Sequence, residues 1–262
     1  MNRMLRLVVA GSAIAAAGVS ASGCVDNTET LFVLGVMVAQ PPTCIFKPDP
    51  TQPILLEGTL DVLLLHSYLA GILVGNQYTP RGAKQNLRAE STRITLRGAE
   101  VTLTDSSGTQ ITCTNDANCG SFTVYGTGFV DTSRSEEPGW GLFSAELIPL
   151  SVGKFIQDTM DSKGVKLKTV YAAVKVFGES LGGQDVTSSV LTYPIQICEG
   201  CLIDFPLAAV ESVGTSGALA CVSSASSTPN QAPCIVGQDA LVDCRLCAGG
   251  NDACKTPFVF SR

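Results

Sequence analysis

The sequence has few of the residues on which catalysis usually depends. Its 262 residues include one histidine, His66, and one tryptophan, Trp140. A single histidine excludes His-rich metal sites, and the leucines at 63–65 beside it favour a strand position at a core edge. Nucleophile-elbow, zincin, phosphate-loop and dinucleotide-binding motifs are missing too. We therefore expect no enzymatic activity, no bound metal and no cofactor.

Charged side chains are also scarce, at 15% of the residues, with 17 Lys and Arg against 23 Asp and Glu. Removing residues 1–23 would take away Arg3 and Arg6 but no acidic residue, so 15 basic residues would face 23 acidic ones. Nucleic-acid binding needs clustered positive charge, so no nucleic-acid partner is expected. Charge alone would not hold this chain on an anionic membrane either.

The first 23 residues have the pattern of an export signal. Arg3 and Arg6 precede an apolar stretch, Leu7 to Val19, which is followed by small residues. The apolar stretch is shorter than the roughly 20 residues that span a bilayer. The small residues before Cys24 resemble the lipobox of bacterial lipoproteins, in which this cysteine carries a diacylglyceryl thioether and becomes the mature N-terminus. The resemblance predicts lipidation of Cys24. Ordinary cleavage after a small residue is the alternative, because Ala21 stands where the family usually has Leu.

The remaining chain divides into three parts by composition. Residues 24–53 are predicted to be a lipid-anchored segment with one buried strand (31–39) and a linker (40–53) that contains five prolines. Residues 54–200 alternate between apolar and polar residues and are predicted to form a β-sandwich domain. Residues 201–262 are predicted to be a cysteine-rich tail that disulfides, rather than a core, make rigid.

Alternation predicts eight strands in the central domain, at 54–64, 68–74, 93–105, 109–113, 122–130, 140–148, 170–176 and 191–197. In the first, Leu56, Leu60, Val62 and Leu64 share one face. The alternation changes phase at Gly98, which predicts a β-bulge. Pro194 cannot donate to a ladder, so its strand is expected at a sheet edge. We predict a mainly β fold, an antiparallel immunoglobulin-like sandwich, although a closed barrel would give the same alternation.

One short connecting helix is expected after residue 150. Val152, Phe155, Ile156 and Met160 recur at helical spacing, and we expect the helix to pack over one end of a sheet. Ser151 is predicted to cap its N-terminus and Gly164 to end it. Asp158 and Asp161 fall on its exposed side. A calcium site formed by Asp105, Asn115, Asp116 and Asn118 is an alternative to ordinary Asx turns at these residues.

Ten cysteines follow Cys24, and in an exported chain they are expected to form disulfides. They are Cys44, Cys113, Cys119, Cys198, Cys201, Cys221, Cys234, Cys244, Cys247 and Cys254. The turn-forming residues between Cys113 and Cys119 predict a local bridge. A local bridge from Cys221 to Cys234 is expected as well.

Two CxxC pairs allow a second interpretation of these cysteines. Cys198 with Cys201, and Cys244 with Cys247, have the spacing found in zinc ribbons and in thiol oxidoreductases. Export favours disulfides over metal thiolates, because oxidation removes the ligands. The alternative hypothesis is a periplasmic protein that exchanges thiols or handles metal.

Three stretches, together with the leader, carry a wider resemblance. They are residues 68–77 (YLAGILVGNQ), 93–101 (RITLRGAEV) and 138–141 (PGWG), and with the leader they resemble uncharacterised envelope lipoproteins of myxobacterial type. The resemblance implies an address in the bacterial cell envelope, at the outer or inner membrane, and no particular activity. The expected function is that of a non-enzymatic structural, adhesive or binding module. Its expected partners are the membrane, through the lipid anchor, and an envelope protein or glycan.

Overall fold

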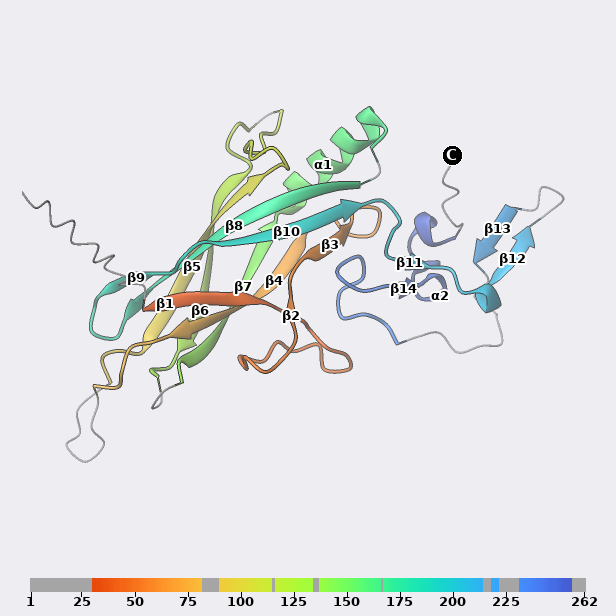
Figure 1. The fold of residues 1–262 in the computed structure, drawn as a ribbon. Helices are drawn as coiled ribbons and strands as arrows, with labels where there is room; N and C mark the ends of the chain where they lie inside the picture. Colours follow the sequence, from red (N-terminus) through yellow and green to blue (C-terminus); the bar gives the residue numbers. More distant parts are fainter. Residues whose placement is uncertain are drawn as a thin grey trace, which may run out of the picture.

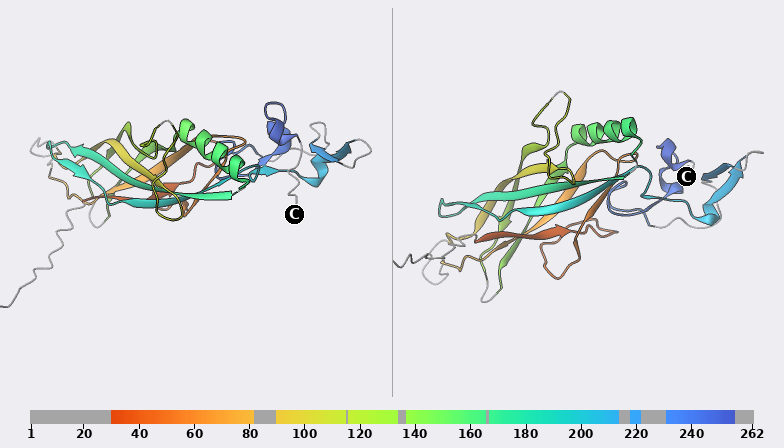
Figure 2. Two further views of the ribbon diagram at one scale, coloured as in Figure 1. Left: turned by 90° about the horizontal axis from the view of Figure 1, so that it is seen from above. Right: turned by 45° about the horizontal axis from the view of Figure 1, so that its top comes forward.

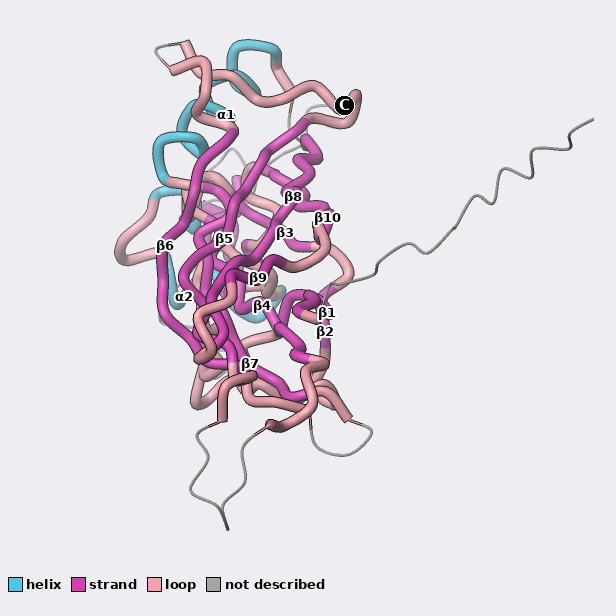
Figure 3. The backbone as a smooth tube through the Cα atoms, turned by 90° about the vertical axis from the view of Figure 1, so that its left-hand side faces the viewer, coloured by secondary structure: helices cyan, strands magenta, loops and turns pink. Residues whose placement is uncertain are grey.

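The computed structural model describes residues 30–81, 90–114, 116–133, 137–165, 167–213, 218–221 and 231–255. The chain is mainly β, as the alternation predicts, and strands make up most of its elongated body (Figures 1 and 3). The predicted signal peptide (residues 1–23) and Cys24 lie outside the described residues. No helix among the described residues is long and apolar enough to cross a membrane.

The first sheet has four antiparallel strands. Their order is β2 (Ile54–Leu55), β1 (Leu31–Met37), β4 (Tyr68–Asn76) and β7 (Gly139–Ile148). β1 corresponds to the buried strand predicted before the proline-rich linker. It ends opposite Gly71, so the first residues of β4 have β7 on one side and no strand of this sheet on the other.

The second sheet has six strands. Along its main path the order is β3 (Gly58–Asp61), β10 (Leu191–Cys198), β8 (Leu167–Ser180), β5 (Ile94–Thr104) and β6 (Ser121–Val130), and β9 (Asp185–Thr187) pairs with β8. All pairs are antiparallel except β3 with β10, which is parallel.

Both sheets curl around one hydrophobic core. The core includes Val36, Ile72 and Phe143 from the first sheet and Leu96, Val174 and Ile195 from the second. The sheets also meet along β6 and β7, where the carbonyl oxygen of Phe129 leaves no room for a side chain at Gly141. The mainly β class is confirmed, and the immunoglobulin-like arrangement stays a prediction.

The single strand predicted over residues 54–64 is wrong. β2 belongs to the first sheet and β3 to the second, so the chain crosses between the sheets after Leu55. Leu56 lies at the crossing and is 87% exposed, whereas Leu60 and Val62 are buried. The alternation of apolar and polar residues continues through the crossing between the two sheets, so the sequence pattern alone could not reveal that crossing.

Two other strand predictions need correction. Residues 109–113 form only isolated bridges, one of them between Gln110 and Thr104. β10 is flanked by β8 and β3 rather than lying at an edge. Its proline is tolerated because β3 begins opposite Ile195, one residue after Pro194, so Pro194 itself pairs only with Tyr171 of β8.

The predicted helix is α1 (Leu150–Lys163), which lies along one side of the strands (Figure 2). It ends at Gly164, whose left-handed φ of 64° suits glycine. Ser151 does not cap it, because the N-cap is Pro149 and no side chain caps the helix. The sequence predicts His66 in a strand, but the structure places it in the bend between β3 and β4. From this bend its Nε2 lies 2.7 Å from Oε1 of Gln157 on α1.

The C-terminal part lies beyond one end of the strands (Figure 1). It contains β11 (Ile203–Asp204), a 3₁₀ turn (Leu207–Ala209), β12 (Val210–Val213), β13 (Ala218–Cys221), β14 (Val242–Asp243), the one-turn helix α2 (Cys244–Cys247) and a second 3₁₀ turn (Asp252–Cys254). The expectation that this tail lacks a core is wrong. Ile203, Ala209, Val242, Cys244 and Cys254 form a small buried cluster.

Candidate functional site

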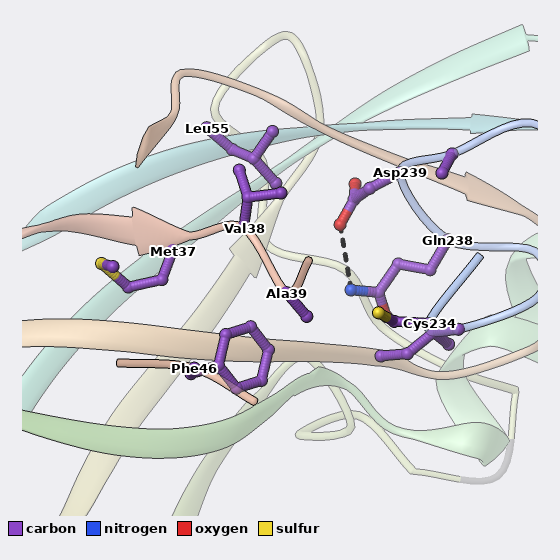
Figure 4. A pocket seen from close by; sticks show the side chains of 10 residues that line it. Met37, Val38, Ala39, Phe46, Leu55, Cys234, Gln238 and Asp239 are labelled. Carbon is purple, nitrogen blue, oxygen red and sulfur yellow. Dashed lines mark hydrogen bonds between the residues drawn. The ribbon is translucent and has the colours of Figure 1, made fainter. Parts of the chain in front are cut away.

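Several places in the described residues combine polar groups with a cavity or with reactive atoms. The first is a pocket between the end of β1, the proline-rich linker and residues 234–240 (Figure 4). Met37, Val38, Phe46 and Leu55 form its apolar wall, and Asp239 lies on the opposite side. The cavity has a volume of about 70 Å³.

Asp239 connects this pocket to two buried tyrosines. The hydroxyl of Tyr68 donates to the Asp239 carboxylate, with oxygen distances of 2.8 and 3.0 Å, and lies 3.0 Å from the hydroxyl of Tyr193. The amides of Thr59 and Gln238 donate to the same carboxylate. Burial raises the pKa of Asp239 and, together with the neighbouring negative charge, the pKa of both tyrosines.

Size decides the role of this pocket. Ligand pockets usually measure about 300–1,000 Å³, several times the volume found here. The Asp239 carboxylate also already accepts hydrogen bonds from three residues. We therefore interpret the Tyr68–Asp239 network as a polar contact that joins the tail to the sheets, and not as a binding site.

The second place is the first CxxC pair at the end of β10. Asp61 is buried beside it, and a carboxylate oxygen of Asp61 and the two sulfurs of Cys198 and Cys201 lie within 4.8 Å of one another. The sulfurs are bonded to each other, and the carboxylate accepts from the amides of Leu63, Gly200 and Leu202. A carboxylate this close disfavours a thiolate, so the arrangement suits a brace better than a reactive thiol.

The other eight cysteines in the described part of the chain are paired as well, and one pairing differs from the sequence prediction. The disulfides are Cys44–Cys234, Cys113–Cys119, Cys198–Cys201, Cys221–Cys244 and Cys247–Cys254. The local bridge expected between Cys221 and Cys234 does not form. Cys234 instead joins the proline-rich linker across 190 residues, because the tail folds back against the first sheet. Five disulfides are typical of an oxidising environment outside the cytoplasm.

The calcium alternative has a local explanation where its residues are described. The Asp105 carboxylate accepts from the amides of Ser107 and Thr109, and Asp116 accepts from the amide of Asn118. These are Asx turns, in which the oxygens serve the backbone of their own loops. Asn115 lies outside the described residues. Asp158 and Asp161 are exposed on α1, as expected.

The third place is on the outer face of the six-stranded sheet. Tyr125 of β6, Gly98 of β5 and Phe177 of β8 stand in register across three adjacent strands. The two rings meet edge to face, with centroids 6.4 Å apart. A cleft of about 380 Å³ lies beside them, lined by Arg97, Glu100, Thr123, Tyr125, Phe177, Gly178, Asp185, Val186 and Thr187, and we call it the Tyr125 cleft.

The predicted bulge at Gly98 shapes this cleft. Both ladders of β5 shift register between Leu96 and Gly98, so the change of phase is confirmed and Arg97 sits at the irregularity. Arg97 and Glu100 consequently both face outward, and Arg97 pairs with Glu179 on β8. The missing side chain of Gly98 leaves room for the Phe177 ring. A bulge therefore aims a cation into the cleft, a common use of bulges at functional sites.

Sequence reasoning missed Tyr125, although the signal was present. Alternation over residues 122–130 places Thr123, Tyr125 and Phe129 on the face opposite the core. Tyr125 is 79% exposed, and Phe129 is 55% exposed with its ring under Arg93 at 4.6 Å. An aromatic ring on the outward parity of a strand is the pattern to look for. Comparison with protein-family models, curated proteins and solved structures finds no match to this chain.

Proposed function

We propose that this chain is an exported, lipid-anchored module of the bacterial cell envelope that binds a ligand in the Tyr125 cleft without catalysing a reaction. The observation that carries the proposal is the cleft itself. Its volume of about 380 Å³ lies within the usual range for ligand sites. It combines an exposed aromatic ring with charged groups of both signs and two threonines. Such a mixture supports recognition of a ligand that has both apolar and polar faces.

The position of the cleft supports an envelope ligand. Leu31, the first residue of β1, forms a bridge with Ser188, and the adjacent Thr187 lines the cleft. β9 and the start of β1 lie at the end of the molecule opposite the C-terminal part (Figure 1). The seven residue-to-residue steps from Cys24 to Leu31 reach at most about 25 Å. An anchor at Cys24 would therefore hold the cleft near the membrane surface.

Export and lipidation have separate support. Five disulfides favour folding outside the cytoplasm. The ten cysteines in the described residues are bonded among themselves, so a thioether at Cys24 would take no partner from the disulfides. The test is metabolic labelling with an alkyne fatty acid in the source bacterium. We expect label on the natural chain and none on Cys24→Ser, and an unlabelled natural chain would refute the anchor.

Binding is tested with the soluble Cys24→Ser protein and washed envelopes of the source bacterium. We expect co-sedimentation that Tyr125→Ala weakens by about tenfold, which corresponds to about 1.4 kcal/mol. Phe129→Ala is the matched control, because this second exposed ring on β6 does not line the cleft. Equal binding by all three proteins would remove the proposed site.

Thiol chemistry at the CxxC pairs is the competing hypothesis. Cys24→Ser protein, purified from the exported fraction and unfolded without reductant, is treated with an alkylating agent and assayed for metal. Ten unreactive cysteines and no metal are the expected result, because every described cysteine is in a disulfide. Alkylation of Cys198 and Cys201, or release of metal, would favour the competing hypothesis.

A further inference from the structure

We propose that the ligand of the Tyr125 cleft is a neutral polysaccharide of the envelope, with one sugar ring stacked on Tyr125. This inference rests on the proposed function and adds the chemical class of the ligand. A pyranose ring has an apolar face of C–H groups and a rim of hydroxyls. It needs an aromatic ring to cover the first and donors and acceptors to satisfy the second.

Tyr125 is held in position to act as the stacking platform. Its edge-to-face contact with Phe177 leaves it 79% exposed. Phe177 is half-buried and fills the space above Gly98, so it supports the tyrosine from the side. A ring fixed in this way loses little conformational freedom when a ligand binds, which favours affinity. The ring of Phe129 is less suited to stacking on a sugar, because Arg93 already lies over its face.

The polar lining can serve hydroxyl groups in both directions. Arg97 donates only, Glu100 and Asp185 accept only, and the hydroxyls of Thr123 and Thr187 do either. These side chains are all exposed and come from β5, β6 and β9. A sugar, which carries several donor–acceptor hydroxyls on one ring, matches such a set. A purely apolar partner would leave the charged groups desolvated and unsatisfied.

The charge of the cleft favours a neutral ligand. Arg97 forms an ion pair with Glu179 and lies 4.0 Å from Asp185. Glu100 stands opposite Lys175 in the β5–β8 ladder. Two cations therefore face three carboxylates, so the local charge is close to balanced and a polyanion finds no field to attract it. The whole chain is acidic, with a formal charge of −6, which further disfavours acidic polysaccharides.

The experiment measures Cys24→Ser binding to washed envelopes under four conditions: protease digestion, periodate oxidation, a competing oligosaccharide and raised salt. If the ligand is a neutral glycan, protease digestion leaves Tyr125-dependent binding intact, and periodate, which cleaves vicinal diols, abolishes it. Laminarihexaose is added as a competitor to cover 1,3-linked chains, which periodate spares. Raising the salt from about 0.05 to 0.5 M changes affinity less than about twofold, because a neutral ligand releases no counterions.

Variants separate stacking from mere folding. Tyr125→Phe keeps the ring and is expected to retain binding within about threefold, whereas Tyr125→Ala loses about tenfold or more. Phe129→Ala stays at the natural level. Three results would refute a neutral glycan as the ligand and leave the proposed function standing. They are the loss of Tyr125-dependent binding after protease digestion, its loss at raised salt, and its persistence both after periodate and in the presence of laminarihexaose. Binding that never depends on Tyr125 would overturn both.

Discussion

The side-chain amide of Gln238 pairs with the backbone of Leu69 as a neighbouring strand would. The amide of Leu69 donates to Oε1 of Gln238 at 3.0 Å, and Nε2 of Gln238 donates to the carbonyl of Leu69 at 2.7 Å. β1 has ended by this point, so Gln238 completes the unpaired side of β4. The backbone on either side of Gln238 pairs with β3, which belongs to the other sheet. One glutamine of the tail therefore joins the two sheets.

Gln238→Ala is expected to cost about 2 kcal/mol or more of unfolding free energy. The substitution removes the partners of the Leu69 amide and carbonyl, which lie in a partly buried contact, and each orphaned group costs about 1–3 kcal/mol where water does not reach it. The measurement is equilibrium urea unfolding of Cys24→Ser protein with disulfides intact. Gln196→Ala is the control, because its bond to Glu57 is exposed. It should change stability by less than about 0.5 kcal/mol. Equal effects would show that Gln238 does not join the sheets.

The contrast between Gly98 and Gln238 shows what the sequence could predict. The bulge at Gly98 was readable because a change of alternation is local to one strand. The role of Gln238 was not, because its partner Leu69 is 169 residues away and no periodicity marks either residue. The Cys44–Cys234 bridge could not be predicted for the same reason, because its two cysteines are 190 residues apart.

Some features of the Tyr125 cleft could likewise be predicted from the sequence, and others could not. The outward parity of Tyr125 follows from alternation, as does the exposure of Arg97 and Glu100 after the phase change. The meeting of Tyr125 with Phe177 depends on the order β6–β5–β8, which places a distant strand beside β5. Sequence pattern gives the face of a strand but not its neighbours, and the cleft needs both.

The raised pKa of Asp239 predicts a fall in stability as the pH rises. Below about pH 4, the ordinary carboxyl value, Asp239 is protonated in the folded and unfolded chains alike. Above it the unfolded chain ionises first, because burial raises the pKa of the folded carboxyl. The unfolded state is then favoured increasingly until the pH passes the folded pKa.

The measurement compares the urea unfolding midpoint of the protein with its natural Asp239 and that of Asp239→Asn between about pH 3 and 8. The difference between the two curves should fall across the window that starts near pH 4 and then level off. Exposed carboxyls such as Asp105, whose pKa is lowered mainly by its hydrogen bond with Ser107, act in the opposite direction and cancel in the difference. A flat difference for Asp239→Asn would contradict its raised pKa.

The long disulfide is expected to stabilise the fold more than the short one. Cys44–Cys234 closes 190 residues and Cys113–Cys119 closes 6. On the chain-entropy model these loops correspond to about 5 and 2 kcal/mol. Paired substitutions, Cys44→Ala with Cys234→Ala against Cys113→Ala with Cys119→Ala, are compared by thermal unfolding. A larger loss of Tm from the second pair would show that local geometry outweighs loop length here.

The bulge should connect the stability of the sheet to binding in the cleft. A Cβ at Gly98 would lie 2.5 Å from Cζ of Phe177 and 2.7 Å from the carbonyl oxygen of Val124. Gly98→Ala must therefore displace the ring, at a cost of about 1–3 kcal/mol. Displacing Phe177 also removes the support of Tyr125, so envelope binding should weaken. Gly249→Ala, where no atom lies within 4 Å, is the control and should change neither quantity.

A double variant separates the two contacts of this glycine. Gly98→Ala combined with Phe177→Ala relieves the clash with the ring but not the one with Val124, so stability should recover only in part relative to the sum of the single effects. Binding should not recover, because Tyr125 has lost its neighbour. If Gly98→Ala leaves binding unchanged while destabilising the sheet, Phe177 serves the packing of β5 alone and Tyr125 holds its position without it.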